Sequence, residues 1–130
     1  MINIPGYEIK EEIYVGADSI VYKAVENENN KPVIIKLLKS EYPEPDELKD
    51  FQGEYNIAKS LESIEGIVRN YQMIDYQNTK AIILEDFGGI SLDKIIKEKK
   101  LDIKTFLYIA VKCAGILEEI HKHKIIHKDI

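Results

Sequence analysis

The sequence predicts an α+β fold with three strands in a meander, one helix, a further pair of strands and then more helices. Residues 7–38 contain three runs rich in β-branched and aromatic residues, separated by short polar turns. Such a pattern is typical of a strand meander. Next come a segment with helical apolar spacing, two more strand-like runs and then helical segments up to about residue 122. The 130 residues suffice for one domain, or two small lobes, with a modest core.

The first three strands are expected at residues 7–15, 19–25 and 33–38. Gly16-Ala17-Asp18 lies between the first two strands and predicts a hairpin turn. The polar segment 26–31 predicts the second turn, because its asparagines adopt tight turn geometries readily. Pro32 opens the third strand, where the missing backbone donor of proline is tolerated.

A helix is expected to begin near Pro45. Proline is favoured in the first helical turn, and Asp46 and Glu47 lie where the positive end of the helix dipole stabilises acidic side chains. The apolar residues that follow have helical spacing: Leu48, Phe51, Tyr55, Ala58 and Leu61. This spacing predicts a helix with one face packed on the sheet.

Two further strands, at residues 67–77 and 80–85, are predicted to form a hairpin that turns at Gln77-Asn78-Thr79. A short helix is expected from Ser91 to about Lys99, and Asp102 is predicted to cap a longer helix that ends near Lys122. In the longer helix Cys113 is expected to be a buried core thiol. The residues of this helix expected to point inward are Phe106, Ile109, Ala110, Cys113, Leu117 and Ile120.

Two charged residues occupy positions that the apolar pattern assigns to packed faces. Lys36 shares a strand face with Ile34 and Leu38, because side chains alternate along a strand, and an unpaired buried ammonium is costly. Glu54 follows Phe51 by three residues and borders the apolar face of the helix. Alone, each residue fits a solvated position, with Lys36 reaching water from an edge strand. Together they predict an ion pair that holds the ammonium ready for phosphate oxygens.

These residues resemble motifs of the protein kinase family. Val33-Ile34-Ile35-Lys36 is similar to the V-A-I-K of the family's third strand, Glu54 to the glutamate of its helix C, and Ile126-His127-Lys128-Asp129 to the start of its catalytic loop. The order of the predicted elements agrees with the family from about Tyr7 to Ile130. The resemblance is to the serine/threonine type and looks bacterial.

The resemblance implies a protein-kinase-like α+β fold, in which the five strands form one antiparallel sheet with helix C and the first helices of the helical lobe follow. Residues 1–87 would form the small lobe, with the glycine-rich hairpin, the lysine strand, helix C and the hinge. Residues 88–130 would form the start of the helical large lobe. The chain ends within the catalytic loop, so this lobe is expected to be incomplete.

The resemblance also implies an ATP site. The family's glycine-rich hairpin, G-x-G-x-x-G-x-V, falls on Tyr14, Gly16, Ser19 and Val21, so only the middle glycine is kept. Gly16 would permit close approach of a phosphate, and Ser19 adds a hydroxyl donor. Alternatively, the segment is only a hairpin turn. The remaining implied contacts are the walls of the adenine pocket, the hinge backbone and the phosphate-binding lysine: Ile13, Val21, Ile34, Leu84, Glu85, Phe87 and Lys36.

The catalytic residues implied by the resemblance are Asp129, Lys36 and Glu54. Asp129 would accept the proton of a substrate hydroxyl. The asparagine and the D-F-G aspartate that hold Mg²⁺ in the family would lie beyond residue 130, so no metal ligand is assigned. These 130 residues are therefore expected to bind ATP at most. The intact protein would use ATP and Mg²⁺ to phosphorylate serine or threonine hydroxyls of an unidentified protein substrate.

Two other functions fit the same residues. The first is a non-catalytic, pseudokinase-like binding or interaction module. The missing glycines favour it, whereas the retained Lys36, Glu54 and Asp129 do not. The second is a small-molecule kinase of the same fold, which usually has a small residue between the catalytic histidine and aspartate, where this chain has Lys128.

Composition limits the partners and the compartment. A net charge of −5 without a concentrated basic patch argues against nucleic acid. No apolar run has the length of a membrane span, and the N-terminal residues lack a secretory pattern. A lone cysteine allows no internal disulfide and fits the reducing cytosol. A cytoplasmic enzyme of signal transduction is expected, whose partners are ATP, a protein substrate, the remaining kinase lobe and further signalling domains.

Overall fold

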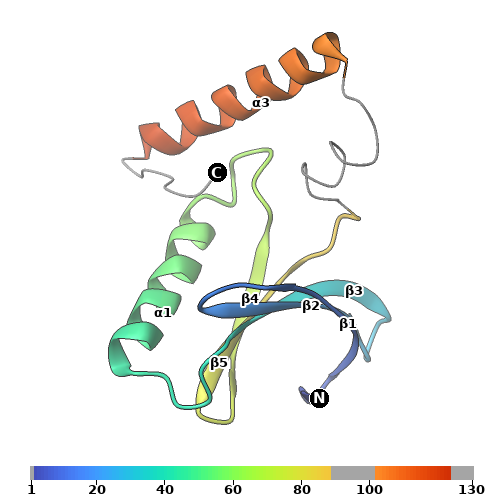
Figure 1. Cartoon of the computed structure of the whole chain (residues 1–130), viewed down its shortest axis with the longest axis vertical. Coiled ribbons are helices and arrows are strands. Elements are labelled where there is room, and N and C mark those ends of the chain that lie inside the picture. The colour runs from blue at the N-terminus through green and yellow to red at the C-terminus, as the bar shows by residue number, and fades with distance from the viewer. Residues whose placement is uncertain (1, 89–101, 124–130) are drawn as a thin grey trace. The chain divides into compact units, whose positions relative to one another are not determined.

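The computed structural model describes residues 2–88 and 102–123. In this part of the chain the elements are β1 (Tyr7–Val15), β2 (Ser19–Glu26), β3 (Lys31–Leu38), α1 (Pro45–Ser60), β4 (Asn70–Tyr76), β5 (Thr79–Glu85) and α3 (Ile103–Lys122) (Figure 1). They belong to two compact units. The first unit comprises residues up to 62 together with 68–86, and the second comprises 63–67 and the residues after 86.

The first unit is built on an antiparallel sheet with the strand order β1-β2-β3-β5-β4. Short turns join β1 to β2, β2 to β3 and β4 to β5, and each of these pairs forms a hairpin. Between β1 and β2 the Gly16 N–H donates to the Ser19 carbonyl oxygen at 2.8 Å. The next two turns contain Asn30 and Gln77 in the left-handed region, with φ of 55° and 52°. The asparagine-rich composition of the first of these turns suits that conformation.

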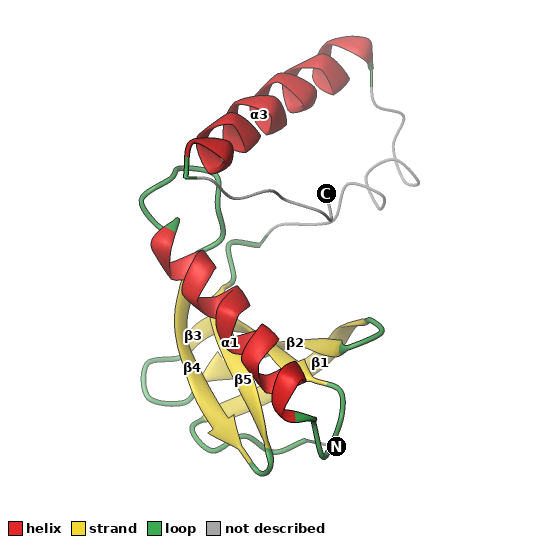
Figure 2. Ribbon diagram, turned by 90° about the vertical axis from the view of Figure 1, so that its left-hand side faces the viewer, coloured by secondary structure: helices red, strands yellow, loops and turns green. Residues whose placement is uncertain are grey.

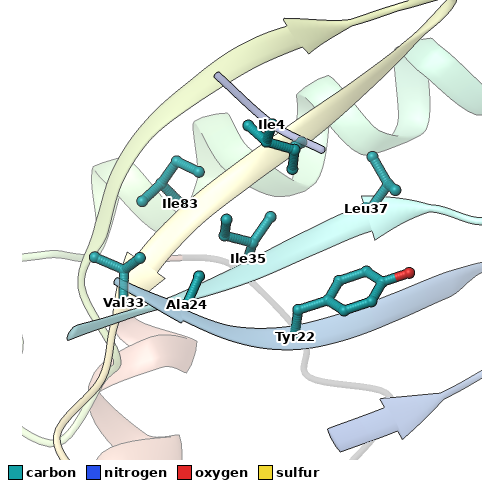
Figure 3. Packing of buried hydrophobic residues seen from close by; sticks show 8 residues of the cluster. Ile4, Tyr22, Ala24, Val33, Ile35, Leu37 and Ile83 are labelled. Atoms are coloured by element: carbon teal, nitrogen blue, oxygen red, sulfur yellow. The ribbon is translucent and has the colours of Figure 1, made fainter. Parts of the chain in front are cut away.

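One side of the sheet, here called the apolar face, is lined by buried hydrophobic side chains from three strands (Figure 3). Cross-strand register explains why they gather there: Tyr22 lies opposite Ile35, and Ile35 opposite Ile83. Directly opposed residues on neighbouring strands place their side chains on the same face. The apolar face comprises Tyr22, Ala24, Val33, Ile35, Leu37, Ala81 and Ile83.

The N-terminal segment closes the apolar face. Ile4 is 1% exposed and belongs to the same cluster of buried residues, although it precedes β1 (Figure 3). Backbone hydrogen bonds fix the segment, because the Tyr7 N–H donates to the Ile4 carbonyl and the Asn27 N–H donates to the Gly6 carbonyl. The Asn3 N–H also donates to the Tyr76 hydroxyl oxygen at 3.3 Å. Burying Ile4 contributes about 1.5–3 kcal/mol before the entropy of ordering the segment is counted.

The opposite side of the sheet, here called the helix face, carries α1 (Figure 2). Phe51 of α1 is 3% exposed and packs in one cluster with Leu38 of β3 and Ile82 of β5. The helix begins at Pro45 and has Asp46 and Glu47 in its first turn, as the sequence predicts. One face of α1 is therefore fixed to the sheet by apolar packing.

In the second unit, α3 follows its predicted boundaries. Asp102 caps it, because its side chain accepts from the Thr105 N–H at 2.7 Å, and this hydrogen bond lowers the pKa of the Asp102 carboxyl. The predicted burial is wrong for Cys113, which is exposed, and for Phe106 and Ala110, which are exposed as well. Ile120 is buried. The 3.6-residue apolar period is present, but in the part of α3 that precedes Ile116 only Ile109 is even partly buried by the described residues.

The α+β class, with a five-stranded antiparallel sheet, is confirmed. The main difference lies at β4, which begins at Asn70 rather than at the predicted residue 67. Gly66 just before it has φ of +96°, a left-handed conformation that interrupts extended backbone. The helix predicted at 91–99 falls outside the described residues. In the described part of the chain no helix is long and apolar enough to cross a membrane.

Candidate functional site

Cross-strand pairing brings most of the predicted nucleotide contacts of the first unit onto the helix face. Val21 of β2 lies opposite Lys36 of β3, and Ile34 of β3 lies opposite Leu84 of β5. Ile34 and Lys36 are two residues apart on one strand, so their side chains share a face. Ser19 is likewise two residues from Val21. One face of the sheet therefore presents a small apolar surface next to a lysine.

Lys36 and Glu54 form the predicted ion pair between β3 and α1. Lys36 Nζ donates to Glu54 Oε1. The two side chains remain 27% and 52% exposed. At this exposure an ion pair contributes only about 0–1 kcal/mol to stability, because water screens the charges. The pair therefore does little for the fold, and its effect is to hold an ammonium at one place on the helix face.

The position of Glu54 depends on contacts that fix α1 in its middle and near its C-terminal end. Phe51, one turn before Glu54, is buried against β3 and β5. Near the C-terminal end of the helix Lys59 Nζ donates to the Asn70 carbonyl oxygen at 3.1 Å and pairs with Glu62 at 3.2 Å. Sequence reasoning did not predict the Lys59 contact. Its only signal was a basic residue in the last helical turn, where exposed carbonyls accept.

The β1–β2 hairpin carries the residues predicted to cover a phosphate. A register shift between Glu12 and Tyr14 marks a bulge, so Ile13 and Tyr14 together oppose Val21. Gly16 stands in the turn, and Ile13 is exposed on the edge strand β1. Cross-strand pairs thus connect Lys36 to Val21 and Val21 to the β1–β2 hairpin.

The predicted hinge begins at the end of β5. The Glu85 N–H donates to the Arg69 carbonyl oxygen at 2.9 Å, so it is already used within the sheet. An adenine base would have to meet the Glu85 carbonyl instead, since a backbone N–H donates one hydrogen bond. Phe87 belongs to the second unit, and Asp129 lies outside the described residues.

Potential metal ligands are not clustered in the described residues. Within 2–88 and 102–123 no group of three or more histidine, cysteine, aspartate or glutamate side chains is arranged to hold a metal ion.

Protein kinases require an ion pair between a lysine of the third strand and a glutamate of the following helix. Lys36 and Glu54 supply this pair on an antiparallel sheet with the corresponding order of elements. The sequence matches the protein kinase domain over residues 7–130, and the chain belongs to the protein kinase family.

Relatives and a solved structure agree with this assignment. The chain is 35% identical over 126 residues to a probable serine/threonine-protein kinase of Clostridium acetobutylicum, covering 95% of this chain and 19% of that protein. It is 31% identical over 126 residues to a casein kinase I homolog of Kluyveromyces lactis, covering 95% of this chain and 23% of that protein. The solved structure of PpkA-294 in its apo form has the same fold, with a TM-score of 0.83 at 18% identity, covering 99% of this chain and 53% of that one.

The chain spans about a fifth of the length of these two relatives. The family is thus shown over residues 7–130, and the solved structure shows the fold. The family and its serine/threonine kinase relatives support phosphoryl transfer as the general chemistry. The roles of individual residues, the substrate and the lobe boundary at residue 87 stay predictions.

Proposed function

We propose that the intact protein transfers the γ-phosphoryl group of ATP to serine or threonine hydroxyls of a cytoplasmic protein substrate. We further propose that these 130 residues by themselves bind ATP without measurable transfer. The observation that carries the proposal is the Lys36–Glu54 ion pair on the helix face. The proposed preference for serine and threonine hydroxyls is supported by the similarity to the probable serine/threonine-protein kinase of Clostridium acetobutylicum.

In the proposed reaction, Lys36 neutralises charge on the phosphates and Glu54 holds the ammonium in place. Val21, Ile34 and Leu84 contact the base with apolar surface. Asp129 accepts the proton of the substrate hydroxyl while the hydroxyl oxygen forms its bond to the γ-phosphorus. The bond from the γ-phosphorus to the bridging oxygen breaks, and ADP leaves with its electron pair. Mg²⁺, when bound, supplies further charge neutralisation.

Thermal unfolding of the full 130-residue chain, with and without ATP, tests the proposed binding. A ligand at a hundred times its Kd stabilises the folded state by about 2.7 kcal/mol. We expect a stabilisation of this order for the unmodified chain, and its loss in Lys36→Ala. Lys39→Ala is the matched control, because Lys39 is an exposed lysine at the end of the same strand.

Two outcomes contradict the proposal. Equal stabilisation by ATP in Lys36→Ala and in Lys39→Ala would show that Lys36 does not hold the phosphates. Turnover of radioactive ATP by the purified 130-residue chain, abolished by Lys36→Ala, would show that these residues suffice for transfer.

One observation favours a second candidate, a pseudokinase-like module that binds nucleotide without transferring phosphate. Tyr14 and Ser19 stand at two of the three glycine positions of the phosphate-binding hairpin. Under this alternative ATP still stabilises the chain through Lys36, but the intact protein shows no transfer. A transfer assay on the intact protein, with Asp129→Asn as its inactive control, distinguishes the two functions.

A further inference from the structure

Tyr14 has its aromatic ring over the glycine of the hairpin. A Cβ atom built on Gly16 would lie 3.0 Å from Tyr14 Cε1 and 3.5 Å from the Tyr14 hydroxyl oxygen. The ring therefore lies against the bare α-carbon of Gly16. Tyr14 is otherwise 62% exposed, so little else in the described structure confines the ring.

Tyr14 is also connected to Lys36 through two cross-strand pairs. It pairs with Val21 across β1 and β2, and Val21 pairs with Lys36 across β2 and β3. Paired residues share a face of the sheet. The Tyr14 ring thus lies on the helix face, in the β1–β2 hairpin and two strands away from Lys36.

A glycine in such a hairpin matters because it lacks a side chain. A phosphate gains most from backbone N–H groups when it can approach the chain closely. The Gly16 N–H itself already donates to the Ser19 carbonyl oxygen. A phosphate that approaches the remaining N–H groups of the turn over the α-carbon of Gly16 therefore meets the Tyr14 ring.

We propose that Tyr14 is a specificity-determining residue that keeps nucleotide phosphates away from the hairpin backbone, leaving Lys36 as their main contact in the first unit. The proposal rests on the nucleotide binding proposed above. The ring is exposed and can swing aside, so it weakens the phosphate contact rather than abolishing it. The hairpin accordingly contributes little to the preference for ATP over adenosine.

Calorimetric titration of the full chain with ATP and with adenosine tests this role. Removing the ring in Tyr14→Gly or Tyr14→Ala should raise ATP affinity by about tenfold, the effect of one regained hydrogen bond to a charged group. Adenosine affinity should stay within about twofold of the unmodified chain, because adenosine has no phosphate. Tyr14→Phe should behave like the unmodified chain, since the ring and not the hydroxyl blocks the approach. Tyr14→Ala serves as the second variant should glycine loosen the strand end.

A double-mutant cycle with Gly16→Ala sharpens the test. In the Tyr14→Gly background the new methyl group should lower ATP affinity by about tenfold, because it covers the position that the ring has left. In the unmodified background the same change should alter ATP affinity by less than about twofold, since the approach is already blocked. Additive effects of the two substitutions would contradict a shared position.

The outcomes separate the two proposals. If Lys36→Ala abolishes ATP binding while Tyr14→Gly leaves ATP affinity unchanged, the role of Tyr14 is overturned and nucleotide binding stands. If Tyr14→Gly raises ATP and adenosine affinity equally, the ring acts on the base and the role is overturned as well. If neither the unmodified chain nor any Tyr14 variant binds ATP, both proposals fail.

Discussion

The two faces of the sheet are built from the same strands but differ in what they leave exposed. On the apolar face the side chains of β2, β3 and β5 are hydrophobic, and the N-terminal segment with Ile4 covers them. On the helix face α1 packs on the sheet through the cluster around Phe51. The Lys36–Glu54 ion pair between β3 and α1 lies on this face as well and stays partly exposed. Strand alternation produces both faces at once, because Ile35 and Lys36 are neighbours in sequence and point to opposite sides.

The two faces therefore have different roles: the apolar face stabilises the fold, and the helix face carries the charged pair proposed to bind phosphate. The apolar face is closed by hydrophobic contacts, each of which stabilises the fold. The Lys36–Glu54 pair is half exposed and contributes little to stability, yet it holds an ammonium that a phosphate can reach. Substitutions on the apolar face should therefore change unfolding, and substitutions of the pair should change ligand binding.

The largest change in the free energy of unfolding is expected at Phe51, which packs α1 on the sheet. Phe51→Ala removes the buried ring that fixes α1 to the helix face, and truncation of a core phenylalanine costs about 3–5 kcal/mol. Because α1 also carries Glu54, the ATP-dependent stabilisation should fall with it. Chemical denaturation with and without ATP measures both effects. Unchanged ATP stabilisation in a folded Phe51→Ala chain would show that the helix position does not control the lysine.

On the apolar face, Ile4→Ala tests the contribution of the N-terminal segment. We expect a loss of about 2–5 kcal/mol in the free energy of unfolding, because Ile4 is buried among aliphatic and aromatic side chains. Ile103→Ala is the control, since Ile103 is 79% exposed. A loss for Ile4→Ala no larger than for the control would mean that the segment does not close the face.

Glu54→Gln tests the ion pair with little change in shape. The free energy of unfolding should change by less than about 1 kcal/mol, whereas the ATP-dependent stabilisation should fall clearly. Asp75→Asn removes another exposed ion pair, the one with Lys80 in the β4–β5 hairpin, and should leave the ATP effect intact. If both variants retain the full ATP effect, Glu54 does not position Lys36.

The smallest effect is a pH dependence that arises on the apolar face. Burial, with a smaller contribution from Glu12, raises the pKa of the Tyr22 hydroxyl above its ordinary value of 10.0. A folded-state pKa above the unfolded one gives stability that is fully present below pH 10.0 and is lost as pH rises through the folded value. Denaturation from about pH 9 to about pH 11 should show a weaker alkaline loss in Tyr22→Phe. The exposed Tyr42→Phe control should keep the loss, and equal curves for both variants would contradict this origin.

Local patterns in the sequence predicted most of the fold. The bounds of β1, the start of α1, the cap at Asp102 and the shared face of Lys36 and Leu38 follow from turn residues, helix-start signals and alternation. The pairing of Lys36 with Glu54 was predictable because two charges beside apolar faces need partners.

What the sequence could not predict depends on contacts between distant residues. The N-terminal segment closes the apolar face through Ile4, which has no periodic pattern around it. The Tyr14 ring lies on Gly16, although the sequence shows only that tyrosine replaces a glycine. Cys113 fits a helical apolar period, but periodicity marks the face that can be buried and does not supply the residues that cover it.

The most direct test of the different roles of the two faces compares the ATP-induced rise in melting temperature of Ile4→Ala with that of Lys36→Ala. We predict that Ile4→Ala melts at a lower temperature yet gains as much from ATP as the unmodified chain. Lys36→Ala should melt near the unmodified temperature and gain nothing. The opposite pattern, with the ATP gain lost in Ile4→Ala and kept in Lys36→Ala, would contradict the assignment of chemistry to the helix face.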